Sequence, residues 1–93
     1  MPGWMIAHLN DHKGPVTDPS LNGIVDTLRG LGCFGFVATE EGFKCEFDGW
    51  ESGRTMRFHL FYDRGDLGPF RLYAGGLDIT DVKSLVTDLR KGR

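Results

Sequence analysis

The chain lacks the compositional features that would assign it to a functional class directly. Its 93 residues include only two cysteines, and its formal net charge is −2. Two cysteines are too few for the disulfide framework of a small secreted protein. A slightly negative chain is a poor general binder of polyanions, which leaves at most a local basic patch. No apolar run has the length of a signal peptide or a membrane span, so we expect a cytoplasmic protein.

Motifs for metal binding, catalysis and phosphate binding are scarce as well. His8 and His12 are four residues apart, but loop-forming residues surround them and no paired cysteine or third histidine is close in sequence. The glycines near residues 65 and 75 lack the lysine and the strand–loop–helix context of a phosphate loop. No nucleophile is predicted beside a base. We therefore expect no metal, no cofactor and no catalytic residue.

An alternation of apolar and polar residues between Cys33 and Gly76 predicts four antiparallel strands in a meander, near 33–38, 43–49, 54–62 and 70–74. Two four-residue stretches, 39–42 and 50–53, have Glu second and Gly last. Four-residue hairpin loops commonly need a positive φ near their end, which glycine adopts at least cost. The two stretches are thus the predicted loops of the first two hairpins.

These loops set a register in which Ala38 lies opposite Phe43, and Phe47 lies opposite both Phe34 and Met56. A slip of one residue would exchange the two faces of a strand, so a correct register must give one apolar face. This register does, with Phe34, Phe36, Ala38, Phe43, Cys45, Phe47, Met56, Phe58, Leu60 and Tyr62 on one side. In the last hairpin, Tyr62 is predicted opposite Phe70, Leu60 opposite Leu72, and Phe58 opposite Ala74. Cys33 and Cys45 fall on opposite faces, so no disulfide is expected.

Helices are predicted at 19–31 and 79–91, because apolar residues recur there at helical spacing. Asp18 and Asp78 are suited to cap their N-termini. The predicted fold is a two-layer α+β domain spanning 1–93, with both helices on the apolar side of the sheet; the alternative places one helix on each side. Residues 18–92 would form the core. Residues 1–17 would form a loop preceded by an arm or by a fifth edge strand at 4–9.

The polar side of the predicted sheet is the candidate binding surface. Arg57 is expected opposite Glu46, and His59 opposite Lys44, with aromatic residues between the charges. The candidate partner-binding residues are Lys44, Trp50, Arg57, His59, Phe61, Arg71 and Tyr73. The alternative interpretation is a solvent-exposed sheet face with ordinary ion pairs, which would have the same residue composition.

Aromatic residues and arginine are enriched at protein interfaces. The function favoured by the sequence is therefore a non-catalytic protein-binding module, of inhibitor or adaptor type. Its partner would be another protein or a second copy, because the uncharged edge strand 33–38 needs either the N-terminal segment or another chain to cover it. A single-stranded nucleic-acid binder using the same face is the alternative. A small enzyme of unknown class ranks third, because a flat sheet face offers its Lys44, His59 and Tyr73 no pocket.

Overall fold

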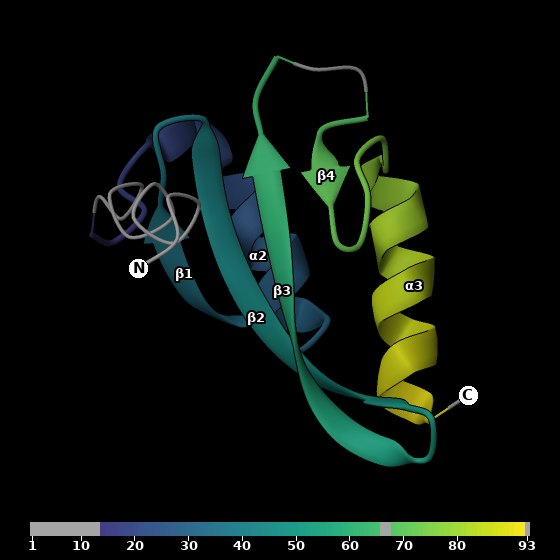
Figure 1. Cartoon of the computed structure of the whole chain (residues 1–93). Helices are drawn as coiled ribbons and strands as arrows, with labels where there is room; N and C mark the ends of the chain where they lie inside the picture. The colour runs from purple at the N-terminus through teal and green to yellow at the C-terminus, as the bar shows by residue number, and fades with distance from the viewer. Residues whose placement is uncertain (1–13, 66–67, 93) are drawn as a thin grey trace, which may run out of the picture.

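A four-stranded antiparallel sheet in the order β1-β2-β3-β4 organises the computed structural model of the chain, in which residues 14–65 and 68–92 are described (Figure 1). The strands are β1 (Phe34–Ala38), β2 (Gly42–Glu51), β3 (Arg54–Asp63) and β4 (Phe70–Arg71). The helical segments are the 3-10 helix η1 (Pro19–Leu21), α2 (Asn22–Gly30) and α3 (Ile79–Lys91). The predicted α+β meander with two helices is thus confirmed. The proposed edge strand at 4–9, the histidines His8 and His12 and most of the N-terminal arm lie outside the described residues.

Both helices cover the same face of the sheet, as predicted. Phe43 and Phe47 of β2 belong to one buried cluster with Leu28 of α2 and with Val82 and Val86 of α3. Each helix presents one apolar stripe because its buried residues recur at helical spacing. The sheet side facing away from the helices is therefore left for charged and aromatic side chains.

The helix starts follow from their capping residues. The Asp18 carboxylate accepts the backbone N–H of Ser20 at the start of η1. At α3, Asp78 accepts the N–H of Asp81, and the Asp81 carboxylate accepts the N–H of Asp78 in return. This reciprocal arrangement satisfies two N–H groups that have no partner within the helix. Both predicted N-caps are confirmed.

Phe34 was predicted to face the core, but a bulge in β1 places it on the other side of the sheet. Ala38 pairs with Phe43 as expected, but the register shifts between Phe34 and Val37, and Phe34 pairs with Glu46 instead of Phe47. Gly35 adopts a φ of 67°, which a residue with a side chain rarely tolerates. The extra residue turns Phe34 to the outer side of the sheet, where it is 39% exposed.

The two cysteines were predicted on opposite faces of the sheet, but with the same bulge both face the core. Cys33 and Cys45 are both buried in the core, and neither forms a disulfide. Their thiols are hydrogen-bonded to each other, which lowers the pKa of Cys33 and, together with burial, raises the pKa of Cys45. The prediction that no disulfide forms holds, but the reason given for it was wrong.

The turn between β2 and β3 has two residues instead of the predicted four, so the strands pair further toward the hairpin tip. Glu51 pairs with Arg54, and the turn consists of Ser52 (φ 53°) and Gly53 (φ 79°). Two central residues with positive φ are typical of a type I′ turn, whose twist matches that of the strands. Phe47 therefore lies opposite Phe58, not opposite Met56. Because the shift is two residues, every side chain of β2 and β3 stays on its predicted face.

β4 is much shorter than predicted. Tyr62 pairs with Phe70 as expected, but the chain leaves the sheet after Arg71. Phe70 exchanges two backbone hydrogen bonds with Leu77, at 2.9 and 3.1 Å, so the segment between them forms a tight reversal. The predicted pairs of Leu60 with Leu72 and of Phe58 with Ala74 are absent from the described sheet.

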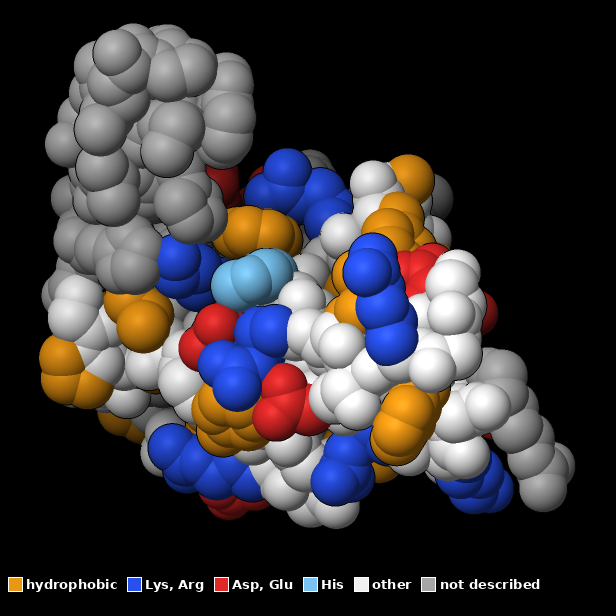
Figure 2. All heavy atoms as spheres, turned by 60° about the horizontal axis from the view of Figure 1, so that its bottom comes forward, with side chains coloured by type: hydrophobic (Ala, Val, Ile, Leu, Met, Phe, Trp, Pro, Cys, Tyr) orange, Lys and Arg blue, Asp and Glu red, His pale blue; other side chains and the backbone are white. Residues whose placement is uncertain are grey.

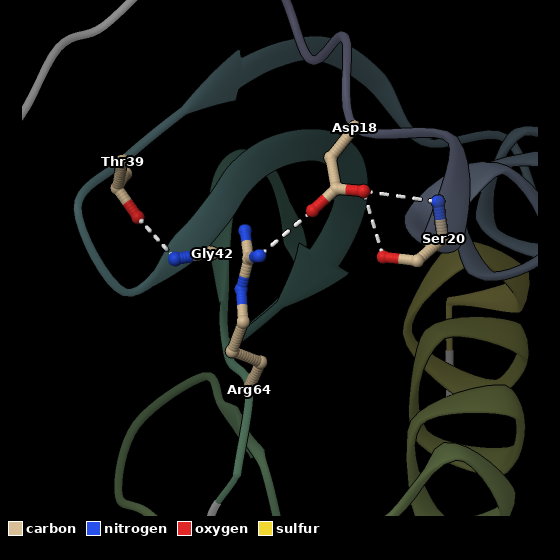
Figure 3. Close-up of polar contacts among 5 residues, drawn as sticks. All are labelled: Asp18, Ser20, Thr39, Gly42 and Arg64. Carbon is tan, nitrogen blue, oxygen red and sulfur yellow. Dashed lines mark hydrogen bonds and ion pairs between the residues drawn. The ribbon is translucent and has the colours of Figure 1, made fainter.

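An ion pair ties the first helical segment to the end of β3 (Figure 3). The Arg64 guanidinium donates to Oδ2 of Asp18 at 2.7 Å. The other carboxylate oxygen, Oδ1, accepts the hydrogen bonds from Ser20. In the neighbouring loop, the Thr39 hydroxyl accepts the backbone N–H of Gly42 at 3.1 Å. Hydrogen bonds from Ser20, with Arg64 adding to them, hold the pKa of Asp18 below its ordinary value of 3.8.

We expect the Asp18 carboxylate to make stability depend on pH in acid. Because its folded pKa is depressed, the stabilisation is present above pH 3.8 and is lost as the pH falls through the folded pKa. Asp18→Asn keeps a capping side chain that does not titrate, so its urea midpoint should fall less than that of the wild type between neutral pH and strong acid. Asp26→Asn, at an exposed carboxylate of α2, is the control. Parallel acid losses in wild type and Asp18→Asn would contradict the prediction.

Candidate functional site

The side of the sheet facing away from the helices forms a mixed charged and aromatic surface, which we call the outer face (Figure 2). Its described residues alternate along β2 and β3 with the buried ones. They are Phe34, Lys44, Glu46, Asp48, Arg57, His59, Phe61 and Arg71.

Arg57 is the centre of this face. Its Nε donates to Asp48 Oδ1 at 2.5 Å, and its Nη1 lies 3.7 Å from Glu46 Oε1. The guanidinium also sits 4.8 Å from the centroid of the Phe34 ring, a cation–π distance. The hydrogen bond to Asp48 raises the pKa of Arg57, so the side chain stays charged at any physiological pH. One cation thus contacts two carboxylates and one aromatic ring.

The remaining outer-face residues continue the same alternation. His59 lies opposite Glu46, with Nδ1 3.7 Å from Oε1 of that carboxylate. Lys44 lies opposite Phe61, and the Arg71 guanidinium is 5.5 Å from the Phe61 ring centroid. The predicted pairs of Glu46 with Arg57 and of Lys44 with His59 were wrong, because the strands of the hairpin pair two residues further along than predicted. Arg57 nevertheless reaches Glu46 along a diagonal.

Trp50 and Tyr73, the other two predicted residues, lie apart from the cluster around Arg57 and contact different parts of the chain. Trp50 is 46% exposed and lies against the end of α3, where a Cβ on Gly92 would be 3.4 Å from the indole. Tyr73 follows β4, and its hydroxyl donates to Glu51 at 3.2 Å. Its ring meets the buried Phe58 edge-on at 6.1 Å. The structure therefore brings together Lys44, Arg57, His59, Phe61 and Arg71 of the seven predicted residues.

Phe34 is the outer-face residue that sequence reasoning missed. The prediction placed it in the core because it alternates with Phe36 and Ala38. A glycine inside a strand often marks a bulge, so Gly35 was the available signal. With the bulge taken into account, Phe34 supplies the aromatic ring beneath Arg57.

Within residues 14–65 and 68–92, no group of three His, Cys, Asp or Glu side chains is placed to hold a metal ion. Among the same residues, no helix is long and apolar enough to cross a membrane.

Fold and surface together define a small α+β protein whose antiparallel meander carries two helices on one face and ion-paired, aromatic-rich side chains on the other. Comparison of the chain with protein-family models, with curated proteins and with solved structures found no match.

Proposed function

We propose that this protein is a non-catalytic protein-binding module that contacts its partner through the outer face. The observation that carries the proposal is the arrangement around Arg57, where Asp48, Glu46 and Phe34 surround a half-exposed guanidinium. Arginine and aromatic side chains are the types in which interface hot spots are enriched. Their mutual contacts also hold the side chains in place before binding, which reduces the entropy that association costs.

The same contacts favour a protein over a nucleic acid as the partner. Phosphate binding needs cations that are free to replace counterions. On this face Arg57 already contacts two carboxylates and His59 lies near one of them, so the local charge is mixed. A mixed surface suits a protein partner with complementary charges of both signs, including a second copy of this chain.

We expect Arg57→Ala to weaken partner binding about tenfold, the effect of losing one moderate hot spot. Immobilised wild-type protein and variants would be incubated with a lysate of cells that express the protein, and the bound proteins quantified by mass spectrometry. Purified candidates would then be titrated by calorimetry, and the mass of the free protein measured by light scattering to detect a homodimer.

Lys83→Ala is the matched control, because it removes one exposed positive charge from α3, on the opposite side of the sheet. Proteins retained by wild type and Lys83→Ala but lost from Arg57→Ala support the proposal. Equal affinity of the wild type and both variants for every purified partner would refute it.

The nucleic-acid alternative has its own measurement. Fluorescence anisotropy with labelled poly-pyrimidine and mixed-sequence strands would show binding that falls steeply with salt if phosphates are neutralised. Flat titrations at low salt exclude that alternative, and a steep salt dependence that Arg57→Ala reduces would establish it instead.

A further inference from the structure

A groove on the opposite side of the sheet from the outer face is not used by the proposed function. It lies where α2 and α3 begin, at the same end of the sheet (Figure 1), and encloses about 320 Å³. Ile24 of α2 and Ile79 of α3 line it, together with Tyr62 and Pro69. These apolar side chains are only half-buried, so the groove is open to a ligand.

Gly23 of α2 also lines this groove. It is the second residue of α2, and glycine is a poorer helix former than alanine. A close approach of helix and sheet would explain a glycine there, but a Cβ at position 23 would meet no atom within 4 Å. Its φ is not in the left-handed region either. Neither packing nor backbone conformation requires this glycine, and it is one of the residues that line the groove.

The polar side chains of the groove are one hydroxyl and one carboxylate. The Thr27 hydroxyl donates to the Gly23 carbonyl at 2.9 Å, so its proton is engaged. Asp78 lines the groove and accepts the Asp81 N–H through Oδ1 alone. Among the described residues no cation pairs with Asp78 or with Asp81. An apolar groove with a negative rim is complementary to a molecule with an apolar body and a positive head.

We propose that this groove binds a small amine with an aryl or alkyl body. The body packs between Ile24 and Ile79 over Tyr62, and the ammonium group lies at the Asp78 carboxylate. The volume is at the lower end of the range of small-molecule sites, about 300–1,000 Å³, which fits a body of one ring or a short alkyl chain. This site is independent of the outer face, so either can exist without the other.

Three probes with the same aryl body and different heads test the proposal: 2-phenylethylamine, 2-phenylethanol and phenylacetate. Each is titrated into the full chain at pH 7 while backbone amide shifts are followed by NMR. We expect the largest shifts at Ile24, Thr27 and Ile79. The amine should bind about threefold more tightly than the alcohol, the effect of one exposed ion pair, and phenylacetate should bind most weakly.

Two substitutions separate the apolar and the charged contributions. Gly23→Leu fills the groove and should abolish binding of all three probes, whereas Gly30→Leu, at the other open glycine of α2, should leave binding unchanged. Asp78→Asn keeps a good N-cap but removes the charge, so the amine should then bind no better than the alcohol. Thermal melts verify that each variant folds.

The proposal is overturned if the amine binds Gly23→Leu as tightly as the wild type, or if the shifts lie away from the groove. It is also overturned if the alcohol or phenylacetate matches the amine in the wild type, because the site then recognises apolar bodies alone.

Discussion

Phe47→Ala should lower the free energy of unfolding by about 3–5 kcal/mol, the range measured for large aromatic residues in protein cores. Phe47 is fully buried in the middle of β2. Its ring stacks on Phe58 across the hairpin, with centroids 5.1 Å apart and an interplanar angle of 13°. Truncation removes this pair and leaves a cavity that the surrounding elements fill only partly. For a domain of this size, the loss is a large fraction of its total stability.

Lys44→Ala is the control for that substitution, because Lys44 is on the same strand but points to the outer face. Its effect should stay well below 1 kcal/mol, as is usual for surface positions. Urea unfolding of both variants gives the comparison. Midpoints that move equally would mean that the two faces of the sheet are assigned the wrong way round.

Gly42→Ala should destabilise the protein by about 1–3 kcal/mol, although it adds a single methyl group. Gly42 is buried at the start of β2, beside the Thr39 and Arg64 contacts that close this end of the sheet. A Cβ there would lie 2.3 Å from the Tyr62 carbonyl oxygen and 2.9 Å from the Tyr62 ring. A backbone carbonyl has little room to move, so β2 and β3 would have to separate locally.

Gly30→Ala provides the contrast, because a Cβ at position 30 meets no atom within 4 Å. It should leave stability unchanged or raise it by about 0.4–1 kcal/mol through the less flexible unfolded chain. Thermal or urea unfolding of both variants measures the difference. If Gly42→Ala proves as stable as Gly30→Ala, the close approach at Tyr62 does not constrain the strand pair.

Sequence periodicity was sufficient for the parts of the fold that depend on local patterns. The apolar stripes around Val25 and Val82 predicted both helices, and Asp18 and Asp78 predicted where they start. The alternation along β2 and β3 predicted which side chains face the core, because that assignment depends only on whether a position is odd or even. Lys44, Arg57, His59, Phe61 and Arg71 were placed on the outer face for the same reason.

The strand pairing needed more than this alternation. A four-residue loop at 50–53 and a two-residue turn at Ser52–Gly53 differ by two positions and give the same faces. The hydrophobic pattern cannot distinguish them, and the positive φ of Ser52 decides between them. For Gly42 the sequence suggested a positive φ, whereas the glycine is required by the close approach of Tyr62. Such a steric constraint arises between strands and leaves no trace in either strand alone.

The chain by itself thus determined the α+β class, the helices with their caps, and the outer-face positions on β2 and β3, but not that of Phe34. Only the tertiary structure decided the neighbours of Arg57. The hairpin turn places Asp48 opposite it and Glu46 within reach, and the bulge places the Phe34 ring beneath its guanidinium. The tertiary structure also decided that Gly23 and Asp78 line one groove, although they lie far apart in sequence. Local periodicity fixes which way a side chain points, but contacts between distant elements depend on how the whole core packs.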